Sequence, residues 1–204
     1  MKSSTPFFLG EICSEERSIN LDTLKNTIIL AIEIAREGRE GKKVGAIFIV
    51  SDTEKVMKRS RCMILDPLKG YTDDEKRITD SNVRETAKEL AQLDGAFLVS
   101  DDGVLVSACR YLNASAKGID LPMGLGSRHM AAASITRETN AVAVVVSESS
   151  IVRVFDDGLL ISEIIPELWM LSNHSLHLSG PVSSRTEKEI TVLSKAEERA
   201  RRKK

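Results

Sequence analysis

Three short, almost entirely apolar runs constrain the fold of this chain more than any other feature. They lie within Val44–Val50, Asp94–Ser100 and Ala141–Ser147, and residues common in turns flank them. A continuous apolar run of this length is typical of a β-strand that is covered on both faces. The chain is therefore expected to build a central sheet with helices packed against it.

Helical periodicity separates these runs. From Leu21 onward apolar residues recur at steps of three and four, which predicts an amphipathic helix that ends at the glycines following it. A second helix is expected over residues 82–92, where Asp80 or Ser81 can cap its first turn. A third helix should begin near Ser127, which stands at the expected N-cap position.

Two hairpins complete the predicted sheet. Asp101–Gly103 is a turn signal, after which residues 104–109 run back along the preceding strand. Residues 151–155 and 159–164 form the second hairpin. Crossovers and hairpins occur together, so the fold class is α/β with a mixed central β-sheet flanked by helices.

The chain divides into four parts at the level of sequence. Residues 1–20 show no clear period and form a lead-in, and residues 21–42 hold the N-terminal helix. The main domain is expected over residues 43–165. Residues 166–204 are predicted to be a helical, charged tail that starts with a short helix near residues 166–171.

Composition excludes several classes of protein. The 204 residues carry a net charge of −1, which argues against a general nucleic-acid coat protein. The longest purely aliphatic run, Ala141–Val146, is far shorter than the roughly 20 residues that cross a bilayer. No secretory signal pattern and no CxxC motif occur, so a cytoplasmic protein without a disulfide framework is expected.

The segment Gly124–His129 has the composition of a phosphate-binding loop. Its glycines let backbone N–H groups converge on a ligand, and the helix that follows favours an anion at its N-terminus. Arg128 adds a planar guanidinium suited to phosphate, and His129 adds a donor that titrates near neutral pH. The alternative is a glycine-containing loop followed by a solvated first helical turn, and spacing alone leaves both open.

Asp94-Gly95-Ala96 places a carboxylate at the mouth of a predicted strand. Gly95 would allow a ligand to approach closely there, although an Asp-Gly pair is also common in an ordinary helix-to-strand turn.

Other polar residues carry weaker signals. Ser147-Glu148 ends a strand, and Tyr111-Leu112 closes the first hairpin. His174 and His177 have the spacing of a metal pair, but no third ligand stands near them in the sequence, which favours a surface tail.

Two of these motifs together resemble a known family. Asp94-Gly95-Ala96 and Gly126-Ser127-Arg128-His129 are similar to the paired DGA and G-[ST]-R-H-R motifs of the diadenylate cyclase domain. The flanking segments Gly45–Val50, Asp66–Tyr71 and Val144–Glu148 resemble the core strand, the NPFKG-type segment and the VVVSE strand of that domain.

The resemblance covers roughly residues 43–162 and implies the fold and activity of the family. Its members condense two ATP molecules into cyclic di-AMP, a second messenger, and release two pyrophosphates. The chain is closest in type to the soluble archaeal cyclases. Met130 departs from the motif, because the family commonly has an arginine there, so a guanidinium that could help to hold a phosphate is missing.

The resemblance also implies residue roles. Asp94, Arg128 and His129 would be catalytic, and Asp94 would bind the divalent metal, Mn²⁺ or Mg²⁺. The ATP-binding residues would be Gly95, Ala96, Tyr111, Leu112, Gly126, Ser127, Arg128, His129, Met130, Ala131, Ser147 and Glu148.

One protomer would supply one ATP, so two chains must face each other in a homo-oligomer built from face-to-face dimers. Two alternatives remain at this stage. The chain could be a non-catalytic module that senses ATP or cyclic di-AMP, which the substitution at Met130 motivates. The charged run Glu197–Lys204 could bind nucleic acid, although a solvated helix end is the usual role of such a run. No membrane partner is expected.

Overall fold

A computed structural model of the chain describes residues 19–167, together with the backbone of residues 182–187 and 190–195. The chain divides into two units, Met1–Pro166 and Glu167–Lys204. None of the helices in the described ranges combines the length and apolarity that crossing a membrane requires.

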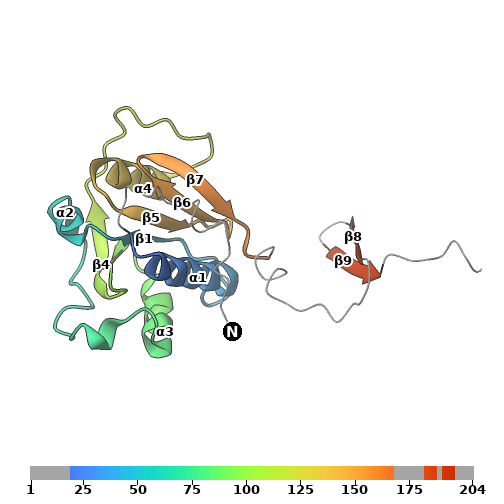
Figure 1. Cartoon of the computed structure of the whole chain (residues 1–204), viewed down its shortest axis with the longest axis horizontal. Coiled ribbons are helices and arrows are strands. Elements are labelled where there is room, and N and C mark those ends of the chain that lie inside the picture. Colours follow the sequence, from blue (N-terminus) through green and yellow to red (C-terminus); the bar gives the residue numbers. More distant parts are fainter. Residues whose placement is uncertain (1–18, 168–181, 188–189, 196–204) are drawn as a thin grey trace, which may run out of the picture. The chain divides into compact units, whose positions relative to one another are not determined.

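The first unit is built on a seven-stranded sheet (Figure 1), in the order β2-β4-β3-β1-β5-β6-β7. Strand β1 pairs in parallel with β3 and antiparallel with β5, and the other pairings are antiparallel. The predicted mixed sheet is therefore confirmed. The strands are β1 (Ala46–Val50), β2 (Ser60–Cys62), β3 (Ala96–Val99), β4 (Leu105–Leu112), β5 (Val142–Val146), β6 (Val152–Asp156) and β7 (Leu159–Ile164).

Between residues 19 and 165, four α-helices and one 3₁₀ turn accompany the sheet. The side chain of Asn20 caps the first helix and that of Asp80 caps the third, each by accepting two backbone N–H groups, so the cap predicted at Asp80 is confirmed. The helical elements are α1 (Leu21–Glu37), α2 (Thr53–Lys58), η2 (Asp74–Lys76), α3 (Ser81–Leu90) and α4 (Ser127–Glu138).

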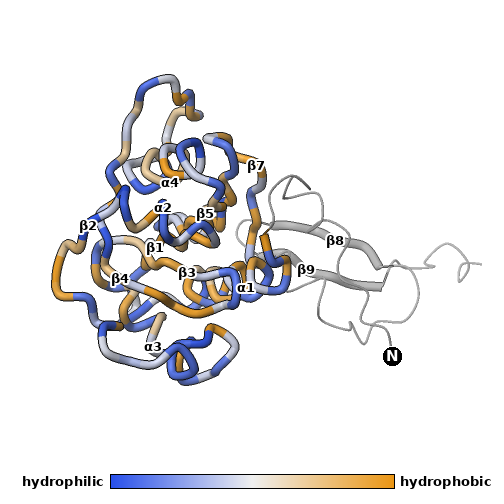
Figure 2. The backbone as a smooth tube through the Cα atoms, turned by 60° about the vertical axis from the view of Figure 1, so that its left-hand side comes forward, coloured by the Kyte–Doolittle hydropathy of each residue, from blue (hydrophilic) through white to orange (hydrophobic). Residues whose placement is uncertain are grey.

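The core lies on both faces of the central strands, as the three apolar runs predict. Every residue of β1, β3 and β5 is buried, and these strands are hydrophobic along their length (Figure 2). Ile47 and Ile49 join the core cluster beneath α4, whereas Phe48 stacks on Phe97 at 4.8 Å between ring centroids. Helices α1 and α4 both pack on β1, β5 and β6 and lie on opposite sides of the sheet (Figure 1).

The region between β1 and α3 is more regular than its sequence predicts. It holds α2 and β2, where only irregular structure was expected. Helix α2 is short and polar and buries only Val56, so it has no periodic apolar face to detect. Strand β2 has three residues and is defined by its pairing with β4, which is a tertiary contact.

The prediction of a helical tail is wrong for residues 182–187 and 190–195. These residues form an antiparallel pair of strands, β8 (Val182–Glu187) and β9 (Ile190–Lys195). Both segments contain β-branched residues, Val182 and Thr186 in the first and Ile190, Thr191 and Val192 in the second, which favour extended backbone over helix. The short helix expected over residues 166–171 and the lead-in of residues 1–20 lie mostly outside the described residues, and the charged run 197–204 lies wholly outside them.

Strand directions explain where the site forms. In the parallel pair Ile47 lies opposite Ala96, so Gly45 and Asp94, each two residues earlier in the chain, share one edge of the sheet. In the antiparallel pair Ala46 lies opposite Val146, which brings the residues after β5 to the same edge. The sheet therefore gathers residues from three distant parts of the sequence at one end of its central strands.

Candidate functional site

Two adjoining pockets lie at this edge, and α4 begins between them. We call them the tyrosine pocket and the histidine pocket, after Tyr111 and His129, each of which lines one pocket only. Ser127 and Arg128, the first two residues of α4, line both.

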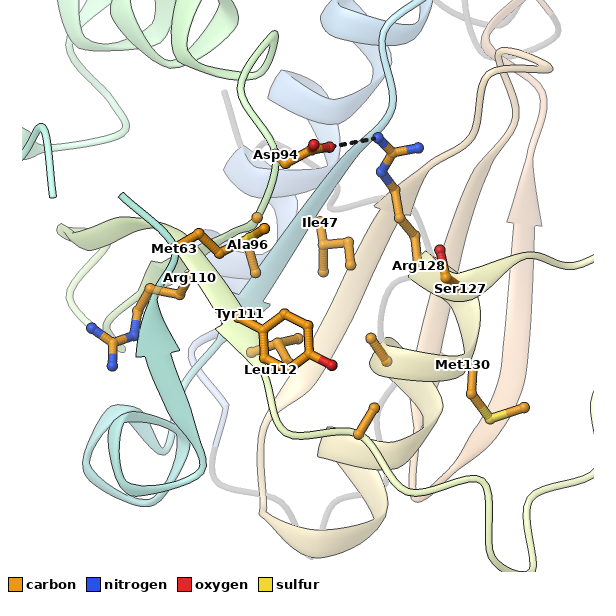
Figure 3. A pocket seen from close by; sticks show the side chains of 13 residues that line it. Ile47, Met63, Asp94, Ala96, Arg110, Tyr111, Leu112, Ser127, Arg128 and Met130 are labelled. Carbon is orange, nitrogen blue, oxygen red and sulfur yellow. Dashed lines mark ion pairs between the residues drawn. The ribbon is translucent and has the colours of Figure 1, made fainter. Parts of the chain in front are cut away.

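The tyrosine pocket has a volume of about 370 Å³ and mostly apolar walls. Figure 3 shows Tyr111 on the β4 side and Met130 on the α4 side, with Ile47 of β1 between them. The guanidinium of Arg61 stacks over the Tyr111 ring at 4.7 Å. The pocket is lined by Ile47, Met63, Asp94, Gly95, Ala96, Arg110, Tyr111, Leu112, Ala114, Ser127, Arg128, Met130 and Ala131.

The histidine pocket has a volume of about 390 Å³ and is more polar. Its lining residues are Gly124, Gly126, Ser127, Arg128, His129, Val146, Ser147, Glu148, Ser149 and Arg153. The N-cap of α4 is Gly126 and not Ser127, because Ser127 already has helical backbone and is the first residue of the helix. Gly126 has no side chain with which to cap the helix, so N–H groups of the first turn stay available to an anion.

Arg128 connects the two pockets through ion pairs with both acidic residues of the site. Its Nη1 lies 3.1 Å from Oε1 of Glu148, and its Nη2 lies 3.6 Å from Oδ1 of Asp94 (Figure 3 shows the latter pair). The side chain of Asp94 is 80% exposed and that of Glu148 is also well exposed. Such exposed pairs contribute little to stability, so a bound anion can readily replace the carboxylates.

His129 is buried beneath the histidine pocket. Its Nε2 lies 3.3 Å from Nη1 of Arg153, and because a guanidinium only donates, Nε2 must accept and the proton resides on Nδ1. Burial lowers the pKa of His129 below its ordinary value, and the positive charges of Arg153 and Arg128 lower it further. The imidazole is therefore neutral at neutral pH.

Gly95 and Ser147 have structural roles in the backbone that the sequence does not indicate. Gly95 has a φ of +111°, and a Cβ atom there would lie 2.5 Å from the carbonyl carbon of Cys109. Glycine is thus required for the close approach of β4, in addition to any ligand. The Ser147 hydroxyl donates to the carbonyl of Ile151 and accepts from its N–H, which fixes the turn between β5 and β6.

The structure brings together the residues predicted from sequence. Asp94, Gly95, Ala96, Tyr111, Leu112, Met130 and Ala131 line the tyrosine pocket, Gly126, His129, Ser147 and Glu148 line the histidine pocket, and Ser127 and Arg128 line both. Their assigned roles stay predictions. His174 and His177 lie outside the described residues.

Sequence reasoning missed several contributors to the site, of which three bear most on its chemistry. Gly45 makes room for the guanidinium of Arg128, Met63 lines the tyrosine pocket and Arg153 lines the histidine pocket. Of these, only Gly45 carried a signal, as a glycine placed directly before a buried strand. Met63 and Arg153 reach the site through strand pairing, which the sequence does not display.

Comparison with curated proteins gives two close relatives. The chain is 47% identical over 167 residues to a protein of Methanocaldococcus jannaschii named diadenylate cyclase, across 81% of this chain and 52% of that protein. It is 46% identical over 147 residues to a diadenylate cyclase of Haloferax volcanii, across 72% of this chain and 54% of that protein. The chain thus spans about half the length of these relatives.

A solved structure shares the fold. The crystal structure of a hypothetical membrane spanning protein from Bacillus cereus superposes with a TM-score of 0.51 at 20% sequence identity, covering 69% of this chain and 62% of that one. At this identity the likeness concerns the fold alone.

The family match covers the whole site. Residues 33–160 match the family described as DisA bacterial checkpoint controller nucleotide-binding, beginning inside α1 and ahead of residue 43, where the domain was expected to start. This range includes every residue of the two pockets. The match, the two archaeal relatives and the shared mixed sheet agree, and the chain belongs to this family of diadenylate cyclase domains.

Proposed function

We propose that this chain is a diadenylate cyclase, which condenses two ATP molecules into cyclic di-AMP and two pyrophosphates. The observation that carries the proposal is the pair of adjoining pockets, one apolar and aromatic and the other polar and cationic, with Arg128 lining both. ATP likewise has two parts, an aromatic adenosine that suits the first pocket and an anionic triphosphate that suits the second. The names of the two archaeal relatives support the same activity.

The tyrosine pocket is suited to the nucleoside. Tyr111 offers a ring for stacking, and Leu112 and Ala131 supply apolar surface at the walls. Arg128 and the first turn of α4 then stand at the junction between the pockets, where the α-phosphate would lie. These groups are in place before the ligand arrives, which favours positioning of the reacting atoms.

The reaction is a double phosphoryl-type transfer. The 3′-oxygen of one ribose forms a bond to the α-phosphorus of the other ATP, and the bond from that phosphorus to the bridging oxygen of pyrophosphate breaks. The electron pair leaves with pyrophosphate and the hydroxyl proton passes to solvent. Catalysis of such transfers depends mainly on alignment and charge neutralisation, and Arg128 with the α4 N-terminus provides positive charge beside the α-phosphate.

A divalent cation fits the donor set of the site. Among the described residues no group of three His, Cys, Asp or Glu side chains could enclose a metal by itself. Mg²⁺ and Mn²⁺, however, are commonly held by one or two carboxylates together with substrate phosphates, and Asp94 presents an exposed carboxylate at the pocket mouth. When bound by Asp94, the ion would supply positive charge at the α-phosphate and make the 3′-hydroxyl more acidic.

The reaction needs a second nucleotide opposite the first, which we assign to a second copy of the chain in a face-to-face dimer. Apolar residues beside the tyrosine pocket support this arrangement. Met63 lines the pocket, and of the two residues that follow it Ile64 is half exposed and Leu65 is 93% exposed. This hydrophobic segment follows β2 in Figure 2 and would be covered in the dimer.

The test is incubation of the chain with ATP and either Mn²⁺ or Mg²⁺, followed by chromatography of the nucleotides. Formation of cyclic di-AMP and pyrophosphate in a ratio of one to two is the expected result. A chain that binds ATP yet yields no product with either metal would instead be a nucleotide sensor. Met130 motivates that second candidate, since it stands where the family commonly has arginine.

A further inference from the structure

Arg153 is an arginine of the histidine pocket for which no role has been assigned. It lies on β6 opposite Val145 and Glu163. Val145 belongs to the core cluster beneath α4, so Arg153 projects from the same face of the sheet toward that helix. Its side chain is only 11% exposed, yet it lines the pocket that adjoins the N-terminus of α4.

The contacts of Arg153 leave part of its guanidinium for a ligand. Its Nε donates to Glu163 at 2.6 Å, and its Nη1 donates to His129 at 3.3 Å. These contacts use two of the five N–H groups that a guanidinium carries, within the part of the chain that the structure describes. Glu163 and His129 thus hold the Arg153 guanidinium from two sides. Because the side chain is already ordered, it loses less conformational entropy when a ligand binds.

The charges of the pocket favour an anion with more than one phosphate. Arg128 and Arg153 both line it, together with the uncapped first turn of α4. Arg128 is paired with the exposed carboxylates of Asp94 and Glu148, which an anion can displace, and Arg153 is paired with the partly exposed carboxylate of Glu163. Arg128 borders both pockets, whereas Arg153 borders the histidine pocket only. Arg153 therefore lies on the side of the site away from the tyrosine pocket, where the nucleoside would bind.

We infer that Arg153 is a phosphate-binding residue, which holds the β- and γ-phosphates of the nucleotide while Arg128 holds the α-phosphate. The inference rests on the proposed function and adds a substrate contact to it. Met130, which replaces the motif arginine, lines the tyrosine pocket. The second guanidinium of this site thus comes from a neighbouring strand and not from α4.

The competing explanation is structural. Arg153 and Glu163 lie directly opposite each other on β6 and β7, and such cross-strand ion pairs stabilise sheets without touching any ligand. A structural role predicts equal effects on every nucleotide, because it acts through the fold. A phosphate contact predicts an effect that depends on the number of phosphates.

The experiment is calorimetric titration of AMP and ADP, neither of which carries the triphosphate needed for cyclisation, into the wild type and Arg153→Gln. We expect Arg153→Gln to weaken ADP binding by about tenfold to a hundredfold, the usual worth of a charge-assisted hydrogen bond, and to change AMP binding less than about twofold. Arg153→Lys should give intermediate ADP affinity, because it keeps the charge without the planar fork. If thermal unfolding shows that Arg153→Gln does not fold, Arg153→Lys is used in its place.

Two matched variants complete the design. Glu163→Gln removes the carboxylate that competes for Arg153 and should bind ADP as tightly as the wild type or more so. Arg59→Gln breaks an exposed ion pair with Glu138 outside both pockets and should bind both nucleotides normally. Equal weakening of AMP and ADP by Arg153→Gln, or no weakening of either, would overturn the inference. A wild type that forms no cyclic di-AMP from ATP with either metal would overturn the proposed function instead.

Discussion

The guanidinium of Arg128 lies directly against the backbone of Gly45, where an added Cβ atom would come within 2.8 Å of Nη1 and 3.0 Å of Cζ. Gly45 precedes β1 and Arg128 is the second residue of α4, so the sheet edge itself sets the position of the arginine. A side chain at position 45 has to displace the guanidinium from between Asp94 and Glu148.

Gly45→Ala is therefore expected to reduce ATP affinity without destabilising the fold. The atoms that a methyl group would meet belong to the end of a flexible side chain, which can move at little cost. Arg128→Ala sets the upper limit of the effect, a loss of about 10- to 100-fold in ATP affinity and a parallel loss of activity. Calorimetry gives both affinities and thermal unfolding provides the control. Wild-type affinity in both variants would show that Arg128 does not hold phosphate.

Asp94→Asn should separate chemistry from binding. The amide keeps the size of the side chain and removes the charge that would hold a divalent cation near the 3′-hydroxyl. We expect kcat to fall at least about 100-fold, the usual scale for a lost electrostatic contribution, while ATP affinity changes little. Asp102→Asn, at an exposed turn outside both pockets, is the matched control. If Asp94→Asn forms cyclic di-AMP at nearly the wild-type rate, Asp94 has only a structural role in the turn before β3.

His129 should make the stability of the fold depend on pH. Its pKa is lowered in the folded state by burial and by Arg153 and Arg128, so the unfolded chain takes up a proton more readily. The contribution of neutral His129 is complete above pH 6.5, the ordinary pKa of histidine, and is lost as the pH falls through 6.5 toward the lower folded value. Urea denaturation at pH 7.5 and 5.5 measures the change. His129→Gln should lose less stability over this interval, and an identical loss in both proteins would contradict the assignment.

Leu65→Glu should impair assembly and leave the nucleotide site of each protomer intact. Leu65 is exposed on the segment beside the tyrosine pocket but does not line it. A charge there opposes burial against a second copy, so the variant should lose specific activity on dilution at higher protein concentrations than the wild type. Sedimentation gives the state of assembly and calorimetry the ATP affinity. Specific activity that stays constant down to monomer concentrations would exclude the face-to-face mechanism.

The sequence predicts the central strands well because their burial on two faces leaves a local signature. Residues 46–50, 96–99 and 142–146 are apolar throughout, and each forms a buried strand. Helix α2 and strand β2 escape prediction, since one buries a single residue and the other depends on pairing with β4.

The same distinction applies to the site. Asp94 and Arg128 belong to motifs that are continuous in sequence, so resemblance finds them. Arg153 has no motif around it and reaches His129 only through the register of β6 beside α4. Likewise Ser127 is of a residue type favoured at N-caps, yet the backbone assigns that position to Gly126.

Strand order also determines at which stage of folding the nucleotide site becomes complete. Pairing β1 with β3 encloses residues 51–95, and pairing β1 with β5 encloses a longer loop, so both pairings cost more chain entropy than local contacts do, and we expect them to form late in folding. Gly45, Asp94 and Glu148 meet only when these pairings are complete. We therefore expect ATP to bind the native state and not the folding transition state, so that it slows unfolding and leaves the refolding rate unchanged.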